Sequence, residues 1–299
     1  MIMHKIPDPA RSARRDWRLI ALVVAGVVVL LLVCGLTIGP RLLSMCYFAL
    51  GSRERLLGQN AAAMSDLSAA IALDPSNAAA YSQRGLLYLN VSEPDKSIAD
   101  FSRAIELDPL NGSNYILRGF QYKKLNKLDQ AISDFQMAIQ LNPSDARGYY
   151  NRGEAYSLQG KLELALVDFN KAIELDPSGD SGGMYGDRAS VYARLGNLNA
   201  AIDDANVALQ KGLVNPNIYY ERALYYRDLG KLEESNADLT VVIGMDPTFA
   251  IAYYERAVNL DKLGKPESAL NDFKSFLAIY QTDDDFRQYA LDRVNREGQ

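Results

Sequence analysis

One residue type recurs along this chain at an almost constant interval. Successive tyrosines of the series are separated by 34, 34, 34, 36, 34 and 34 residues. The series consists of Tyr47, Tyr81, Tyr115, Tyr149, Tyr185, Tyr219 and Tyr253. A period of about 20–50 residues is the signature of a repeat architecture, in which each copy packs only on its neighbours. The interval therefore restricts the chain to an array of similar hairpins.

Other columns share this period and show helical spacing. A small residue follows each tyrosine by four positions, and an arginine follows six of the seven by three positions. The arginine column is Arg84, Arg118, Arg152, Arg188, Arg222 and Arg256. Offsets of i, i+3, i+4 and i+7 indicate one face of a helix, and a later Ala–Phe column indicates a second helix. Asp-Pro or Asn-Pro closes five copies, which ends the second helix because the residue before proline favours extended conformations.

These columns resemble the tetratricopeptide repeat, a helix-turn-helix unit of 34 residues with aromatic, glycine, alanine and proline positions at fixed offsets. The resemblance covers about residues 44–279 in seven copies. Tyrosine replaces the usual tryptophan, and arginine replaces the leucine before the glycine. The first copy departs from the pattern, with Leu50 in place of the arginine and Glu54 in place of the second tyrosine. The fold that this resemblance implies is all-α: a right-handed α-solenoid with a C-terminal capping helix, behind one N-terminal transmembrane helix.

The expected organisation has six segments. They are a basic cytoplasmic tail at 1–18, a transmembrane helix at 19–39, repeats one to four at 44–177, an inter-block turn at 178–183, repeats five to seven at 182–281 and a capping helix at 283–299. The turn is expected because "SGDSGG" lengthens the fifth copy by two residues. This glycine-rich stretch lacks the G-x-x-x-x-G-K-[ST] pattern and the preceding strand of a phosphate-binding loop.

The segment 19–39 contains 21 residues without a charge. At about 1.5 Å per residue, a helix of this length spans roughly the 30 Å of a bilayer core. A cleaved signal peptide would have a shorter apolar core followed by a small-x-small site, and no such site follows here. A lipoprotein signal would use Cys34, but the bulky Val33 precedes it. We therefore expect an uncleaved anchor.

Basic residues predict the orientation of this anchor. Five lie before the segment, in residues 5–18, and three lie after it, in residues 41–55, which favours a cytoplasmic N-terminus. The repeats would then face the periplasm or another exoplasmic space, and a bacterial inner membrane is the expected location. Gly35 and Gly39 form a GxxxG pair, which is compatible with a homodimer contact, although glycines are common in spanning helices.

The residue inventory argues against an enzyme. The chain has one histidine, His4 in the basic tail, and two cysteines, Cys34 and Cys46. Histidine-dependent nucleophilic triads, zinc sites and disulfide frameworks need more of these residues in the body of the chain. Asp and Glu pairs are expected on solvent faces. No cofactor or metal is expected, and residues 44–299 carry 26 Lys and Arg against 35 Asp and Glu, a net charge of −9 that opposes nucleic-acid binding.

The resemblance implies a groove for a protein or peptide partner, lined by the first helices of the repeats. Two columns, one and five residues after each tyrosine, supply its apolar surface, and further columns supply charges. The predicted partner-binding residues are Phe48, Leu86, Ile116, Phe120, Lys123, Tyr150, Glu154, Arg194, Tyr220, Leu224, Arg227, Tyr254 and Val258. Seven basic residues against three acidic ones in the charged columns predict a locally positive groove and a peptide with apolar anchors and acidic groups. Shielding of some of these residues by neighbouring hairpins is the alternative.

Two functions remain open at this point. The first is a membrane-anchored adaptor or scaffold that binds a partner protein in its groove and organises a complex at the membrane. The alternative is an accessory factor of the cell envelope whose tyrosines and carboxylates bind glycan or cell-wall material.

Overall fold

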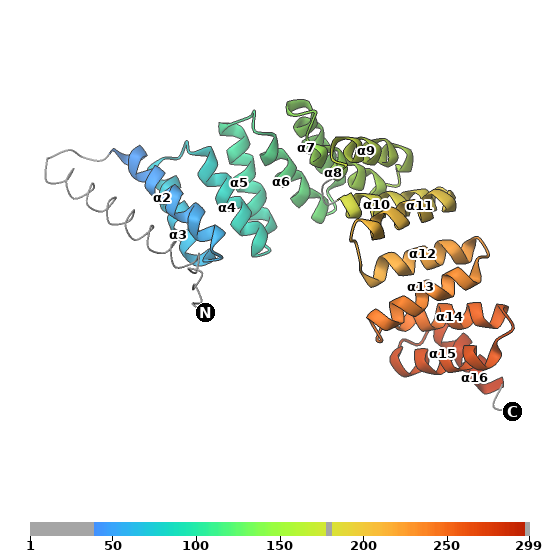
Figure 1. Ribbon diagram of the computed structural model, residues 1–299. Coiled ribbons are helices and arrows are strands. Elements are labelled where there is room, and N and C mark those ends of the chain that lie inside the picture. The colour runs from blue at the N-terminus through green and yellow to red at the C-terminus, as the bar shows by residue number, and fades with distance from the viewer. Residues whose placement is uncertain (1–38, 178–180, 297–299) are drawn as a thin grey trace, which may run out of the picture. The chain divides into compact units, whose positions relative to one another are not determined.

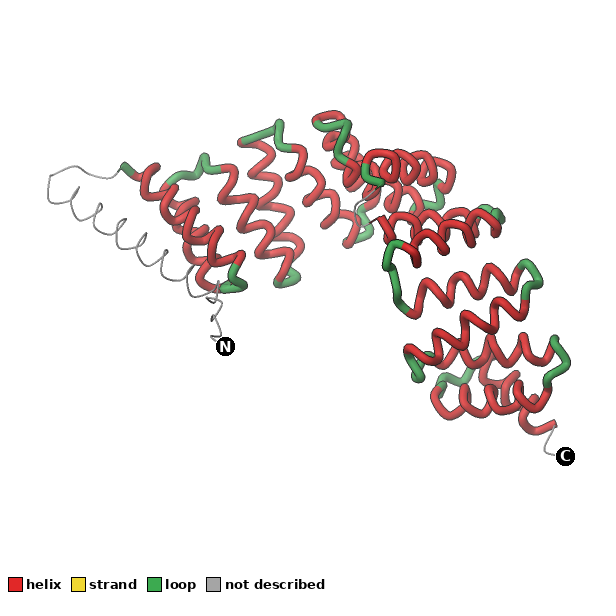
Figure 2. Tube along the Cα trace, viewed as in Figure 1, coloured by secondary structure: helices red, strands yellow, loops and turns green. Residues whose placement is uncertain are grey.

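The structure, a computed structural model, describes residues 39–177 and 181–296. These residues form helices joined by short turns, with no strand among them (Figure 2). The apolar segment 19–39 and the basic tail lie outside the described residues except for Gly39. Among the described residues, no helix combines the length and apolar character needed to cross a membrane.

Fifteen helices occupy the described residues, and the first fourteen of them pair as seven consecutive hairpins (Figure 1). They are α2 (Pro40–Leu56), α3 (Asn60–Leu73), α4 (Ala78–Asn90), α5 (Pro94–Leu107), α6 (Gly112–Lys124), α7 (Leu128–Leu141), α8 (Ala146–Leu158), α9 (Leu162–Leu175), α10 (Ser181–Arg194), α11 (Leu198–Gln210), α12 (Pro216–Asp228), α13 (Leu232–Met245), α14 (Ala250–Lys262), α15 (Pro266–Ile279) and α16 (Asp285–Arg296).

The described chain divides into two compact units after Leu110. The first holds the hairpins α2–α3 and α4–α5, and the second holds the remaining hairpins and α16. The expected inter-block turn at 178–183 lies partly outside the described residues, which exclude 178–180. Ser181 already begins α10, and α10 packs on α9 within the second unit. The repeats on either side of this turn belong to the same unit.

Left-handed backbone at one position ends each first helix. Gly160 has a φ of 76° and terminates α8, and glycines hold the same turn in four other repeats. In the second and third repeats, Ser92 and Asn126 take this conformation with φ values of 59° and 57°. Pro94 and Pro266 begin second helices, where a missing N–H has no helical partner to lose. These local signals confirm the predicted hairpins.

Close approach of the two helices in a hairpin depends on the small residue of the first helix. A Cβ atom added at Gly153 would lie 3.0 Å from the ring of Phe169 on α9. At Gly119 the corresponding distance to the Phe135 ring is 2.7 Å. The phenylalanines are buried, so each ring fills the space that the missing side chain leaves. This contact repeats along the array and forms the core between paired helices.

The arginine column binds a column of buried aspartates. Nε and Nη2 of Arg152 donate to the two carboxylate oxygens of Asp168 at 2.7 and 2.8 Å, which joins α8 to α9. The same bidentate salt bridge, between residues 16 positions apart, occurs in six repeats in all. The aspartates are Asp100, Asp134, Asp168, Asp204, Asp238 and Asp272. The expectation that Asp residues lie on solvent faces is wrong for this column, because the second helix turns these carboxylates toward the arginine.

These arginines also contact aromatic rings of their own helix and, in four repeats, the preceding hairpin. The guanidinium carbon of Arg152 lies 5.9 Å from the ring centres of Tyr149 and Tyr156, within the range of cation–π attraction. In the later repeats the remaining guanidinium nitrogen reaches the preceding hairpin. Arg222 donates to Asn206 at 2.6 Å, and Arg256 donates to Thr240 at 2.9 Å. One side chain therefore ties two helices of its own repeat to the repeat before it.

This arrangement predicts a large stability difference between two carboxylates of α9. Asp168→Ala leaves the half-buried Arg152 without its partner, and we expect a loss of about 3 kcal/mol in the free energy of unfolding. The matched control is Glu174→Ala, which removes an exposed pair with Lys171 and should cost less than about 1 kcal/mol. Urea unfolding followed by circular dichroism measures both. Equal losses in the two variants would contradict a structural role for the arginine–aspartate pair.

Candidate functional site

The first helices of the second unit form one continuous face. Helix α6 contacts α8, α8 contacts α10 and α10 contacts α12, whereas the second helices of these repeats make no contacts of comparable extent with one another. The array of this unit therefore curves toward its first helices. We call the surface formed by α6, α8, α10 and α12 the first-helix face.

Six predicted partner-binding residues lie partly exposed on this face, and Arg194 is exposed. The six are Phe120, Lys123, Tyr150, Glu154, Tyr220 and Leu224. Arg227, also half-buried, lies at the end of α12. Ile116 is only 7% exposed, so it belongs to the packing around α6 and is not available as an anchor. The shielding that the sequence left open thus applies to some of the predicted residues.

Helix α16 covers the last predicted positions. The ring of Tyr254 on α14 lies 5.1 Å from Phe286 and 6.0 Å from Tyr289 of α16, both edge-on. Arg293 of α16 donates to both carboxylate oxygens of Asp261 on α14 at 2.7–2.8 Å. Val258 packs against the same apolar cluster. Tyr254 and Val258 therefore also pack against the C-terminal end of the array, and their role in partner binding stays a prediction.

The remaining two predicted residues belong to the other unit. Phe48 on α2 packs against the buried cluster that contains Ala63 and Leu67 of α3. Leu86 on α4 is half-buried. The candidate site therefore consists only of residues of the second unit.

Polar contacts cross from one repeat to the next on the first-helix face. Nζ of Lys123 on α6 donates to Glu154 on α8 at 2.6 Å, and the Lys123 side chain is only 10% exposed. The hydroxyl of Tyr150 on α8 donates to Asp187 on α10 at 2.5 Å. Tyr150 also packs on Phe169, with ring centres 5.9 Å apart. These contacts hold neighbouring first helices in register.

Three carboxylates on this face are partly buried and close enough to repel one another. Burial raises the pKa of Glu154, and Lys123 only partly offsets this rise. Burial also raises the pKa of Asp187, against the lowering effect of the Tyr150 hydroxyl. The pKa of Glu221 on α12 is raised by burial and by the nearby charge of Asp187. Lys123 thus counteracts the rise in pKa at Glu154 and Asp187, but not at Glu221.

The predicted positive charge of the groove is therefore overestimated, because the count changes from seven basic residues against three acidic ones to seven against six. A column two residues after each tyrosine, absent from the charge count that led to the prediction, supplies Asp187, Glu221 and Glu255. Glu255 accepts from Arg227 at 2.7 Å, and burial raises the pKa of the adjacent Tyr220 to about 12. The missed column was visible in the sequence, because it lies next to one of the two apolar columns that were used.

The carboxylates border a small pocket between α10 and α12. Its volume is about 290 Å³, at the lower end of the range for ligand pockets, and it suits a single side chain. Asp187, Ser190 and Glu221 line it together with glycines of α10 and Leu213. Gly186 lies against Leu213, where an added Cβ would approach to 3.2 Å.

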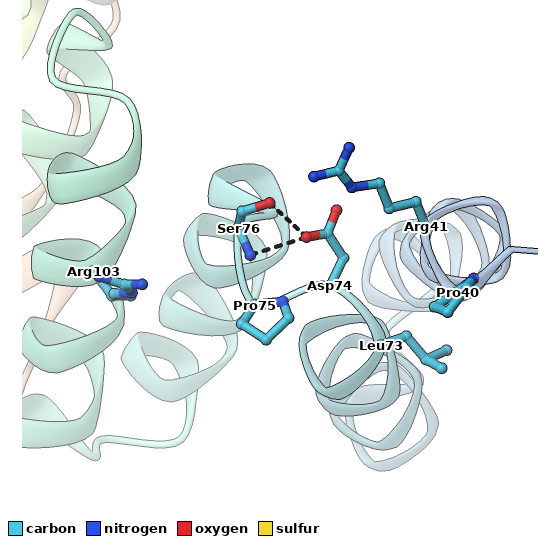
Figure 3. Close-up of a pocket in the computed structure, with 7 residues that line it drawn as sticks. All are labelled: Pro40, Arg41, Leu73, Asp74, Pro75, Ser76 and Arg103. Carbon is cyan, nitrogen blue, oxygen red and sulfur yellow. Dashed lines mark hydrogen bonds between the residues drawn. The ribbon is translucent and has the colours of Figure 1, made fainter.

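A second hollow, of about 600 Å³, lies in the first unit (Figure 3). Arg41 and Arg103 reach it from two sides. Its acidic residue, Asp74, accepts from both the N–H and the hydroxyl of Ser76, which lowers its pKa. That contact is the turn between two hairpins, and no predicted partner-binding residue lines the hollow.

Stacked helix hairpins with this geometry define a class of protein, the helical-repeat scaffold. Sequence profiles of the tetratricopeptide repeat match residues 78–111, 146–178 and 216–249, and a further profile of the repeat matches 51–91 and 119–160. The chain therefore belongs to the tetratricopeptide repeat family. Proteins with this fold act in protein–protein interaction.

Solved structures agree in fold. YrrB, described as a TPR protein with an unusual peptide-binding site, is 22% identical, with 64% of this chain and 97% of that chain covered and a TM-score of 0.56. A tetratricopeptide repeat protein from Parabacteroides merdae is 18% identical over 86% of this chain and 99% of its own, with a TM-score of 0.60. Pseudomonas aeruginosa pilF is 18% identical over 70% and 95%, with a TM-score of 0.61. No curated protein sequence matches the chain.

The partly buried carboxylates are expected to make the folded chain less stable as the pH rises. A carboxyl group whose pKa is raised in the folded state binds its proton more readily there, so it adds stability as pH falls from 7 toward about 4. Asp187→Asn removes this group but keeps an oxygen that can accept from Tyr150. We expect Asp187→Asn to be more stable than the wild type at pH 7–8, with the difference shrinking toward pH 4.

Urea unfolding at several pH values measures this difference. The exposed Asp203 on α11 provides the control, since Asp203→Asn changes a solvated carboxylate and should give a profile parallel to the wild type. A constant difference between Asp187→Asn and the wild type across this range would contradict the prediction.

Proposed function

We propose that the chain is a membrane-anchored adaptor that holds an extended partner peptide on the first-helix face. The observation that carries this proposal is the combination, on that face, of partly exposed aromatic side chains with carboxylates that have too few cations around them. Tyr220 and Leu224 offer apolar contact beside the pocket of Asp187 and Glu221. The peptide-binding site described for YrrB, a protein of the same fold, favours a peptide over other ligands.

The charge on the face selects the chemistry of the partner. Asp187 accepts one hydrogen bond from Tyr150, and Glu221 has only a 3.5 Å contact with the Tyr225 hydroxyl. A lysine or arginine side chain in the pocket would neutralise both carboxylates and form charge-assisted hydrogen bonds with them. The partner segment is therefore basic next to its apolar anchors, in place of the acidic segment that the sequence suggested.

Binding to synthetic peptide pools tests this proposal. Purified protein should bind apolar peptides that contain Lys or Arg, and it should bind acidic peptides and cell-wall polysaccharide more weakly. Asp187→Asn with Glu221→Gln should weaken binding of the basic peptides about tenfold or more, equivalent to about 1.4 kcal/mol. Glu174→Gln on α9 is the matched control and should bind as the wild type does. Equal binding of acidic and basic peptides, or preferred binding of polysaccharide, would overturn the assignment.

The anchor is the second part of the proposal. The sequence supports it through the uncharged segment 19–39 and the basic residues on either side. A reporter that is active only after export, fused after Gln299, should be active in cells, and the same reporter fused after Asp16 should be silent. A silent C-terminal fusion would reverse the orientation. A chain lacking residues 1–39 should leave the membrane fraction.

A further inference from the structure

Helix α2 has an apolar outer face. Ser44 and Gly51 are buried, and a Cβ added at Gly51 would collide with Leu67 of α3. At 3.6 residues per turn, Leu42 and Leu56 lie on the opposite side of the helix, as Arg53 does, and Met45 lies at the edge of that side. The exposed fractions of Leu42, Met45 and Leu56 are 50%, 62% and 77%.

The end of a solenoid normally has a polar outer face, because no further repeat covers it. The C-terminal end follows this rule. On α16, Gln288, Asp292 and Arg296 are exposed, and Phe286 and Tyr289 pack on Tyr254 while each remains 43% exposed. Helix α2 is the first helix of the array within the described residues. Its exposed apolar residues would therefore be unfavourable if this end of the array faced water.

The chain before α2 indicates what covers this face. The uncharged segment 19–39 ends at Gly39, and α2 begins at Pro40. A spanning helix that ends at residue 39 would deliver α2 to the headgroup level without a linker. The charges of α2 also fit a lipid surface. It carries Arg41, Arg53 and Arg55 against Glu54, a net charge of +2, whereas residues 44–299 as a whole carry −9.

We propose that α2 lies in the bilayer interface, with its outer apolar face at the boundary between headgroups and acyl chains. This inference rests on the proposed anchor at 19–39. An amphipathic helix with arginines beside an apolar face binds in this way, through buried apolar area and attraction to anionic lipid. The first repeat thus contacts the membrane through α2. The bilayer covers the apolar face of α2, as the polar helix α16 covers the last repeat at the C-terminal end.

Fluorescence of the full-length chain in vesicles tests the proposal. The vesicles contain phosphatidylethanolamine and anionic phosphatidylglycerol, with a doxyl quencher on the acyl chains of a tracer lipid. In a background with Cys34→Ala and Cys46→Ala, an environment-sensitive dye is attached through Met45→Cys or Leu56→Cys. The control is Val167→Cys on α9, whose 64% exposure matches that of Met45. Circular dichroism establishes that each labelled chain is folded.

We expect emission from positions 45 and 56 to shift to the blue and to be quenched by the lipid-borne doxyl several-fold more than emission from position 167. Quenching at 45 and 56 that equals the control, in chains that resist alkaline extraction from the vesicles, would overturn the inference and leave the anchor intact. Protection from an aqueous quencher without lipid quenching, together with disulfide formation between copies at position 45, would assign the face to a dimer instead. Extraction of the wild-type chain by alkali would overturn both the anchor and the seating of α2.

Discussion

The bidentate salt bridge between an arginine of the first helix and an aspartate of the second helix sets the geometry of every repeat except the first. A planar guanidinium that donates to both oxygens of a buried carboxylate fixes the rotation and the separation of the two helices. The rings of neighbouring tyrosines on the same helix lie within cation–π range of this group. The first repeat shows what its loss does. Leu50 replaces the arginine, and Asp66 is left beside Glu54, whose pKa is raised by burial and by that neighbouring charge.

Much of this fold could be predicted because its signals are local. Glycine at a left-handed turn, proline at a helix start and the 34-residue period each report on a few neighbouring residues. The partner of the arginine column escaped prediction for a different reason. Asp168 lies 16 residues from Arg152, and that separation becomes a contact only once the hairpin folds. The aspartate column was equally periodic, so pairing columns of opposite charge across the expected turn would have found it.

The binding residues were predicted from their position within a single repeat. That position does not show which residues of the adjacent repeats contact them. Tyr150 keeps its position on the first-helix face, but its hydroxyl is committed to Asp187 of the next repeat. Tyr254 occupies the equivalent column and is covered, because α16 packs where the first helix of a further repeat would stand. Equivalent positions in a solenoid therefore differ in accessibility according to the helix that packs next to them. The charge of the groove was overestimated because one uncounted column adds three carboxylates, which leaves seven basic residues against six acidic ones.

The proposed peptide binding would explain the carboxylates of the first-helix face, which a role in stability does not. Asp187 and Glu221 are partly removed from water beside each other, and this raises the pKa of both groups, which means that their charged forms destabilise the folded chain. A structural role would be served by an arginine opposite them, as it is at six other carboxylates of this protein. The chain places no such partner there among the described contacts, and a small pocket lies at that point instead. Binding of a cationic side chain would remove the repulsion between Asp187 and Glu221. The free energy by which this repulsion destabilises the free protein would then contribute to the affinity for the partner.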